Sequence, residues 1–125
     1  MRIDFFEDKP MVSGVHHIAI IASLESSVEF YSKLGFTEIF RKVRAYDTVV
    51  LMEGYGIKLE IFVDPNHPKR EKDPERLGLR HLSLKVDSCE EMSKKYKCGP
   101  IGKDWVGENY CYTEDPDGLV IEFHE

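Results

Sequence analysis

The stretch VHHIAIIA at residues 15–22 decides how this chain is interpreted, because the second half contains a close counterpart. The counterpart, LRHLSLKV at residues 79–86, keeps the spacing of apolar residues and places His81 where the first stretch has His17. Alternation of apolar and other side chains is typical of a β-strand with one buried face. The match therefore predicts two similar units, each of which begins with such a strand.

A second pair of similar stretches supports the duplication. KLEIF at residues 58–62 resembles VIEFH at residues 120–124, and Glu60 occupies the position of Glu122. The number of residues between the His and the Glu is nearly the same in both halves. We therefore expect each half to end in a strand that carries one glutamate.

Between these two strands, the first half has the pattern of a helix and further strands. Ser23 is expected to cap a helix over about residues 24–34, and Gly35 is expected to end it. The apolar face of that helix is formed by Leu24, Val28, Tyr31 and Leu34. Strands are expected at residues 37–43, 46–53 and 57–63.

The second half repeats this order after a polar segment. Residues 64–78, DPNHPKREKDPERLG, contain three prolines and no periodicity, which is typical of a linker or flap. Ser88 is expected to cap a short helix over about residues 89–97. Strands are expected at residues 79–86, 101–105, 109–114 and 119–124. The chain is thus predicted to be one α+β domain, residues 1–125, with a βαβββ module at about 15–63, a linker at 64–78 and a second module at about 79–125.

Strand alternation places two histidines and two glutamates on matching faces. Successive side chains of a strand point to opposite faces, so each of these residues lies opposite the apolar face of its strand. The four residues are His17, Glu60, His81 and Glu122. A carboxylate is costly to desolvate in a half-buried sheet, and a divalent cation removes that cost. Because the two units are equivalent, we expect the four side chains to face one cavity, where they suit Zn²⁺, Ni²⁺, Co²⁺, Mn²⁺ or Fe²⁺.

The composition excludes several classes of function. The net charge is −6, and an acidic chain without a basic stripe is poorly suited to nucleic acid. No apolar run approaches the roughly 20 residues that span a bilayer, and residues 1–14 lack the pattern of a signal peptide. We therefore expect a cytoplasmic protein without nucleic-acid or membrane partners. The three cysteines, Cys89, Cys98 and Cys111, show no pairing pattern and are expected to be reduced thiols.

The longer motifs resemble those of the vicinal-oxygen-chelate superfamily, in its glyoxalase I-like (glyoxalase/bleomycin resistance/dioxygenase) branch of single-domain bacterial proteins. The motifs are VHHIAI (15–20), VEFYSKLGF (28–36), KLEIF (58–62), GLRHLSLKV (78–86) and DPDGLVIEFHE (115–125). The resemblance implies two βαβββ modules that form an open, cup-shaped mixed sheet around one divalent metal ion per site, first of all Zn²⁺ or Ni²⁺. It implies the ligands His17, Glu60, His81 and Glu122, the same set that the repeat indicates.

The resemblance also implies an activity. A glyoxalase I-like site is a lyase or isomerase that converts a small oxo-thiol adduct, such as the hemithioacetal of methylglyoxal, into a thioester through an enediolate. A metal ion acts there as a Lewis acid, and proton transfer is assigned first to Glu122, with Glu60 sharing it. The candidates for lining the cavity are Phe62, Ser83, Lys85 and Trp105. A homodimer is expected, because half a cup leaves sheet edges unpaired, with the site formed within one chain or between two.

Alternative functions of the same fold stay open at this point. Glyoxalases of the family hold the glutathione glutamate with an Arg and an Asn, where this chain has Ile21 and Asp64, so the thiol is not fixed. Glu60 disfavours the other metalloenzymes of the family, which include epimerases, dioxygenases and thiol transferases. As a fourth ligand, and an anionic one, it closes a coordination position on the metal. A non-catalytic small-molecule binding protein is disfavoured by the four retained ligands.

Overall fold

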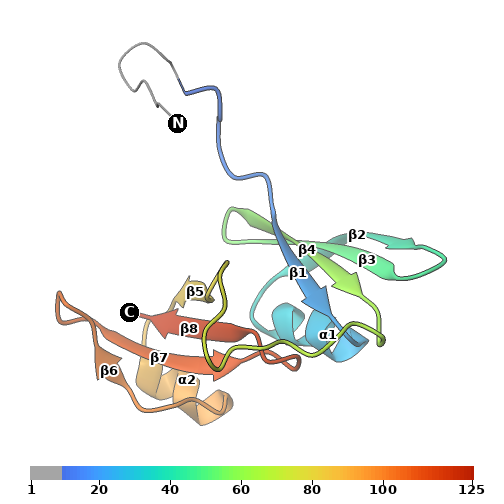
Figure 1. Cartoon of the computed structure of the whole chain (residues 1–125). Helices are drawn as coiled ribbons and strands as arrows, with labels where there is room; N and C mark the ends of the chain where they lie inside the picture. The colour runs from blue at the N-terminus through green and yellow to red at the C-terminus, as the bar shows by residue number, and fades with distance from the viewer. Residues whose placement is uncertain (1–9) are drawn as a thin grey trace, which may run out of the picture.

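Two βαβββ modules follow one another along the chain (Figure 1). The structure is a computed structural model that describes residues 10–125, so most of the segment tested for a signal peptide lies outside the described residues. Module 1 consists of β1 (Ile18–Ala22), α1 (Glu25–Lys33), β2 (Thr37–Val43), β3 (Thr48–Gly54) and β4 (Ile57–Val63). Module 2 consists of β5 (Leu82–Lys85), α2 (Cys89–Lys95), β6 (Gly102–Lys103), β7 (Asn109–Glu114) and β8 (Val120–His124).

Each module folds into its own four-stranded mixed sheet, with strand order β1-β4-β3-β2 in module 1 and β5-β8-β7-β6 in module 2. The first strand of each module pairs in parallel with the last, and the remaining pairs are antiparallel. The predicted α+β class and the duplicated βαβββ order are therefore confirmed. No hydrogen-bonded strand pair joins the two sheets within the described residues, so β1 and β5 are both sheet edges.

The strand registers repeat as closely as the sequence does. Ala19 lies opposite Glu60 in the β1–β4 pair, and Ser83 lies opposite Glu122 in the β5–β8 pair. Ala19 follows His17 by the same interval as Ser83 follows His81. The duplication is thus a property of the hydrogen-bonded register and not only of the residue pattern.

The apolar faces of the strands form the core, as their alternation predicts. The side chains of Ile20, Leu59 and Ile61 are buried in module 1, and those of Ile121 and Phe123 are buried in module 2. Burying a side chain of this size stabilises the fold by roughly 1.5–3 kcal/mol. The opposite faces of the same strands stay accessible, and they carry the candidate ligands.

Several predicted element ends differ in the structure. The expected strand at 46–53 begins at Thr48, and those at 79–86 and 101–105 shorten to Leu82–Lys85 and Gly102–Lys103. The Ser88 cap is confirmed, because its hydroxyl accepts a hydrogen bond from the Glu91 amide at 3.1 Å. Gly35 ends α1 with φ of +110°, a conformation that glycine adopts readily.

The predicted cap of α1 is wrong, although the helix begins at Glu25, close to the expected position. Leu24 is the N-cap residue, no side chain caps the helix, and Leu24 is 56% exposed instead of belonging to a buried face. The hydroxyl of Ser23 donates to the carboxylate of Asp117, which lies in the turn between β7 and β8. A partner distant in sequence therefore replaced the local capping bond that the sequence favoured.

The modules are joined through α1 and the β7–β8 turn, which lie side by side (Figure 1). Asp117 accepts hydrogen bonds from the Ser23 amide (2.9 Å) and the Ser27 hydroxyl (2.6 Å). The hydroxyl of Tyr31, a fully buried side chain, donates to Asp115 at 2.7 Å. These polar contacts set the position of one module against the other.

The three cysteines are free thiols, as expected. Cys89 and Cys111 are fully buried, and burial raises the pKa of both thiols. Within the described residues, no helix has the length and apolar character needed to cross a membrane.

Candidate metal centre

The first candidate pair joins the start of module 1 to its last strand. His17 immediately precedes β1, and Glu60 lies on β4, the parallel neighbour of β1. The imidazole Nε2 of His17 is 3.9 Å from Oε1 of Glu60, and the side chains are 35% and 30% exposed. The parallel pairing of β1 with β4 brings together two residues that are far apart in sequence.

The second pair has the same arrangement in module 2. His81 immediately precedes β5, and Glu122 lies on the parallel neighbour β8. Nε2 of His81 is 3.8 Å from Oε1 of Glu122. The side chains are 22% and 13% exposed, so this pair is more enclosed than the first.

The structure brings the four residues together as two pairs and not as one group. Across residues 10–125, no three or more His, Cys, Asp or Glu side chains are arranged to hold one metal ion. Each pair belongs to adjacent strands of one sheet, and the two sheets do not meet edge to edge within the chain. Within residues 10–125 of one chain, the four side chains therefore form two separate pairs.

The donor set of each pair fits a divalent metal. Distances of 3.8 and 3.9 Å are too long for a hydrogen bond, so imidazole and carboxylate do not satisfy each other. They are within the roughly 4.2 Å that two metal–ligand bonds of about 2.1 Å can span. Neutral imidazole nitrogen and carboxylate oxygen are ligands that Zn²⁺, Ni²⁺ and Mn²⁺ accept.

The second pair is surrounded by polar and aromatic side chains. Ser83, a predicted lining residue, donates its hydroxyl to Oε1 of Glu122 at 2.6 Å. The Tyr112 ring packs edge-on against the His81 ring at 5.5 Å, and Nη1 of Arg80 lies 3.1 Å from Nδ1 of His81. Neither Tyr112 nor Arg80 was predicted from the sequence as part of the site. Tyr112 could have been found from the pairing of β7 with β8, which sets it opposite Glu122.

The first pair has different neighbours. Phe62 follows Glu60 on the same face of β4, and the guanidinium of Arg44 lies 5.6 Å from the Phe62 ring. Asp47 holds this guanidinium with two hydrogen bonds of 2.6 and 2.7 Å, which raise the pKa of Arg44. Arg44 was also missed, because the β2–β3 turn that carries it is distant from Phe62 in sequence.

The remaining predicted lining residues take less specific positions. Lys85 is exposed at the end of β5. Trp105 is 99% exposed in the turn between β6 and β7, and β6 is the edge strand opposite β5 in the sheet of module 2. The sequence predicted a strand at 101–105 that included Trp105. In the structure that strand ends at Lys103, so Trp105 lies in the turn that follows it.

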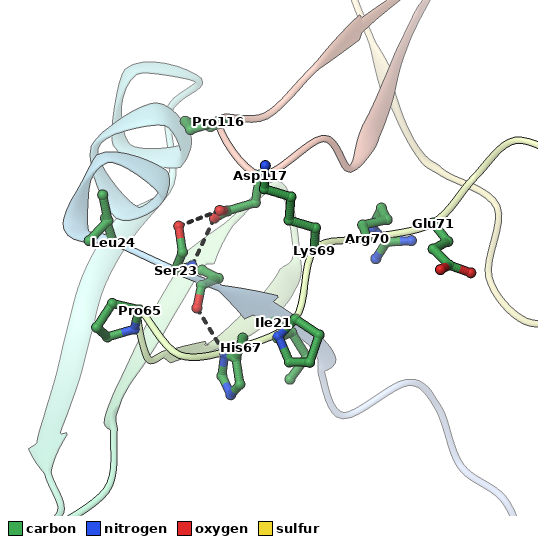
Figure 2. A pocket seen from close by; sticks show the side chains of 12 residues that line it. Ile21, Ser23, Leu24, Pro65, His67, Lys69, Arg70, Glu71, Pro116 and Asp117 are labelled. Carbon is green, nitrogen blue, oxygen red and sulfur yellow. Dashed lines mark hydrogen bonds between the residues drawn. The ribbon is translucent and has the colours of Figure 1, made fainter.

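A cavity of about 720 Å³ lies beside the C-terminal end of β1 (Figure 2). Ile21 lines it from the same strand face that carries His17, and the linker supplies His67, Lys69 and Arg70. The His67 ring is fixed by a 3.0 Å contact between its Nδ1 and the carbonyl oxygen of Ala22. The predicted linker is therefore partly packed against module 1, and it brings basic side chains close to Ile21.

Comparisons with known proteins agree with the observed fold. The family model described as "Glyoxalase/Bleomycin resistance protein/Dioxygenase superfamily" matches residues 14–123. Escherichia coli YaeR is 37% identical over 123 residues, covering 89% of this chain and 95% of YaeR. Bacillus subtilis YwkD is 35% identical over 126 residues, covering 92% of this chain and 98% of YwkD. The glyoxalase family protein from Enterococcus faecalis superposes with a TM-score of 0.80 at 32% identity, covering 98% of this chain and 100% of that one.

More distant solved structures share the fold. Lactoylglutathione lyase from Agrobacterium tumefaciens has a TM-score of 0.64 at 18% identity, over 93% of this chain and 96% of that one. A FosX variant from Listeria monocytogenes, complexed with Mn(II), has a TM-score of 0.67 at 19% identity, over 91% of this chain and 93% of that one. Divalent metal binding is thus present within the fold. The family match over residues 14–123, the relatives above 30% identity and the duplicated βαβββ architecture show that this chain belongs to the glyoxalase/bleomycin resistance protein/dioxygenase superfamily.

Proposed function

We propose that this chain is a metal-dependent, glyoxalase I-like lyase or isomerase that acts on a small oxo-thiol adduct such as the hemithioacetal of methylglyoxal. The observation that carries the proposal is the pair of equivalent His–Glu arrangements, with donor atoms 3.9 and 3.8 Å apart. Four such ligands, two of them carboxylates, match the glyoxalase I-like ligand pattern. The match includes Glu60, and a glutamate at this position disfavours the alternative metalloenzymes of the family.

The metal would be held by His17, Glu60, His81 and Glu122. When bound, it would supply a Lewis acid that stabilises negative charge on the two neighbouring oxygens of the substrate. The fit of the donor set supports this assignment, since imidazole nitrogen and carboxylate oxygen are common ligands of Zn²⁺ and Ni²⁺.

The chain's own carboxylates would move the proton. In the hemithioacetal, the C–H bond next to sulfur breaks, and a glutamate oxygen takes the proton. The same carboxylate returns it to the adjacent carbon, the former carbonyl carbon. The hydroxyl proton of the hemithioacetal passes to the former carbonyl oxygen, which becomes the hydroxyl of the product, while the carbon bonded to sulfur becomes the thioester carbonyl. No oxidant or reductant is needed, because the reaction is an isomerisation.

We further propose that the complete centre forms in a homodimer. The two pairs of one chain do not form a single group within residues 10–125, so four ligands at one metal require His17 and Glu60 of one chain with the partner's His81 and Glu122. Strands β1 and β5 are sheet edges with backbone groups available for such an approach. Val15 and Leu79, two residues before each histidine, are 77% and 81% exposed, and a partner chain would cover them.

The thiol carried by the substrate is a separate question. Ile21 lies on the exposed part of β1 and offers no positive charge at the position where glutathione-dependent relatives have an arginine. Lys69 and Arg70 are basic side chains that line the same cavity as Ile21, together with the acidic Glu71 and Asp117. These residues favour an acidic thiol adduct that is bound differently from glutathione.

Metal analysis and an isomerase assay test the proposal together. The purified protein should carry one divalent ion per four-ligand centre, and H17A, E60Q, H81A and E122Q should each lower metal content. Histidine and glutamate controls are H67A and E53Q, which lie outside both pairs and should retain the metal. The protein should convert methylglyoxal hemithioacetals, assayed first with glutathione and then with other low-molecular-weight thiols. A wild-type protein that takes up no stoichiometric metal would contradict the proposal.

A further inference from the structure

The two histidines of the candidate metal centre have different partners at Nδ1. In module 1, Nδ1 of His17 lies 2.9 Å from Nδ1 of His16, and an imidazole partner can either donate or accept a hydrogen bond. In module 2, Nδ1 of His81 lies 3.1 Å from Nη1 of Arg80. A guanidinium has N–H donors and no acceptor, so its partner has to accept. Of the two contacts, the one in module 2 therefore decides which ring nitrogen carries the proton.

The contact with Arg80 fixes the tautomer of His81. Because Nδ1 accepts the hydrogen bond, the proton of the neutral ring is on Nε2. Nε2 is the nitrogen that faces Oε1 of Glu122, at 3.8 Å, and that would bind the metal. A metal ion needs the lone pair of the nitrogen that it binds, and a histidine ligand commonly donates a hydrogen bond from its other ring nitrogen. The contact with Arg80 and metal binding through Nε2 therefore require opposite tautomers.

The linker holds Arg80 in this position. Oε1 of Glu75, which lies in the linker, accepts a hydrogen bond from Nε of Arg80 at 2.6 Å. The guanidinium also lies 5.7 Å from the centroid of the Tyr112 ring, and its Nη1 is 3.5 Å from the Tyr112 hydroxyl. The Arg80 side chain is 56% exposed, so it can leave His81 without opening the core. Arg80 thus connects the linker to a candidate metal ligand through a contact that is free to break.

We propose that Arg80 controls metal loading of the proposed centre: its guanidinium competes with the metal ion for His81, and Glu75 of the linker keeps it there. This inference rests on the proposed function and adds a regulatory contact to its ligand set. When Arg80 leaves Nδ1, that nitrogen can carry the proton, and Nε2 presents its lone pair to the metal. Withdrawal of Arg80 also removes a positive charge from the neighbourhood of the cation, so both effects favour metal binding. The position of the linker is thereby coupled to metal affinity.

The first experiment measures Zn²⁺ and Ni²⁺ affinity by competition with a chromophoric chelator. R80M removes the donor and the charge, and it should bind about 10-fold more tightly than wild type, as expected for the loss of one competing hydrogen bond from a charged donor. R80Q removes the same charge but offers Nδ1 an amide oxygen as an acceptor, so it should bind at least as tightly as R80M. The matched control is R76M, because Arg76 carries the same charge in the linker but pairs with Glu71 at 3.0 Å. R76M should stay within about threefold of wild type, since the charge of an exposed side chain is screened by salt. Equal affinities for R80M and R76M would overturn the inference.

A second pair of variants tests the role of the linker. E75Q loses the carboxylate that holds Nε of Arg80, and it should bind both metals several-fold more tightly than wild type. E71Q releases Arg76 instead, and it should match wild type. Equal affinities for E75Q and E71Q would overturn the coupling between the linker and the metal centre.

The second experiment observes the tautomer of His81 and depends neither on turnover nor on metal binding. Long-range proton–nitrogen correlation spectra of the metal-stripped protein at alkaline pH show which ring nitrogen carries the proton, and H81A identifies the His81 signals. In wild type the proton should be on Nε2, and saturation with Zn²⁺ should leave it on Nδ1. A proton on Nδ1 of the metal-stripped wild type would overturn the inference.

These measurements separate the inference from the proposed function. If wild type binds neither Zn²⁺ nor Ni²⁺, the proposed function fails, and this inference fails with it. If wild type binds either metal and R80M has the same affinity, only this inference fails. Circular dichroism checks that each variant is folded, which the exposed position of Arg80 favours.

Discussion

The backbone amide of Ser23 donates a hydrogen bond of 2.9 Å to the carboxylate of Asp117, and this bond ties the start of the first helix to the last turn of the chain. The hydroxyls of Ser23 and Ser27 donate to the same carboxylate (Figure 2 shows the Ser23 contacts). The amide of Ser23 lies just before α1, where a helix leaves donors unsatisfied and favours negative charge. Asp117 therefore contributes both to the stability of α1 and to the placement of the modules.

Replacing Asp117 with Ala should destabilise the protein by about 2–4 kcal/mol, because three donors lose a charged acceptor in a partly buried position. S27A removes a single donor and should cost about 1 kcal/mol. Urea denaturation followed by far-ultraviolet circular dichroism measures both changes. Trp105, the only tryptophan, is fully accessible and is a poor fluorescence reporter of unfolding. A D117A variant as stable as S27A would show that the Ser23 bonds contribute nothing.

The same carboxylate should make stability depend on pH. Burial alone would raise the pKa of Asp117, but the hydrogen bonds from Ser23 and Ser27 outweigh it and hold this pKa below its usual value. Its contribution is therefore complete above the unfolded pKa of about 3.9 and is lost as pH falls through the lower folded value. The free-energy difference between wild type and D117N should shrink between about pH 5 and pH 2. A difference that stays constant across that range would contradict the assignment.

Gly35 should tolerate substitution much less well than other glycines. Its φ is +110°, and an added Cβ would collide with the Tyr55 hydroxyl, which donates to the Leu34 carbonyl. G35A should cost about 2 kcal/mol, the sum of backbone strain and the displacement of Tyr55, on the order of 1 kcal/mol each. G56A shares the positive φ, at +76°, but has no atom within 4 Å of the added Cβ, so it should cost about 1 kcal/mol.

G14A is the neutral control for this series, because Gly14 has neither a positive φ nor a close neighbour. Thermal unfolding should give the highest melting temperature for G14A, a lower one for G56A and the lowest for G35A. If G35A and G56A melt together, the contact with Tyr55 has no energetic weight.

Mixed dimers should reveal where the four ligands meet. A chain with H17A and a chain with H81A each lack one half of the proposed centre, and neither alone should bind metal normally. In a heterodimer of the two, one site combines two intact pairs, His17 and Glu60 from the H81A chain with His81 and Glu122 from the H17A chain. Co-expression with two affinity tags should therefore restore one metal per heterodimer.

The matched control for this experiment co-expresses two differently tagged H17A chains, which cannot form an intact centre in any pairing. A heterodimer without metal, or a wild-type protein that is monomeric at micromolar concentration by light scattering, would contradict assembly of the site between chains.

Much of the candidate site could be predicted because the necessary information is local. Alternation along 15–22 and 79–86 identifies the face that carries each histidine, and the opposite face packs into the core through buried Ile20 and partly buried Leu82 and Leu84. The repeat then selects the same positions in both halves. Arg44 was missed because it comes from the β2–β3 turn and meets Phe62 of another strand. Tyr112 was missed because its contact with His81 depends on how strands pair, which no local pattern encodes.

The sequence by itself determined the two βαβββ modules, the faces of their strands and the identity of the two His–Glu pairs, since side-chain direction in a strand follows from a period of two residues. Only the tertiary structure decided that Ser23 bonds to Asp117 instead of capping α1. It also decided that the two His–Glu pairs stay separate within residues 10–125 of one chain. Finally, it decided that the Ser83 hydroxyl donates a hydrogen bond to Glu122, whereas the equivalent residue opposite Glu60 is Ala19, which has no donor. These outcomes depend on strand register and on the packing of one module against the other. Both join residues distant in sequence, and such contacts have no signature in the local pattern that encodes a strand or a helix.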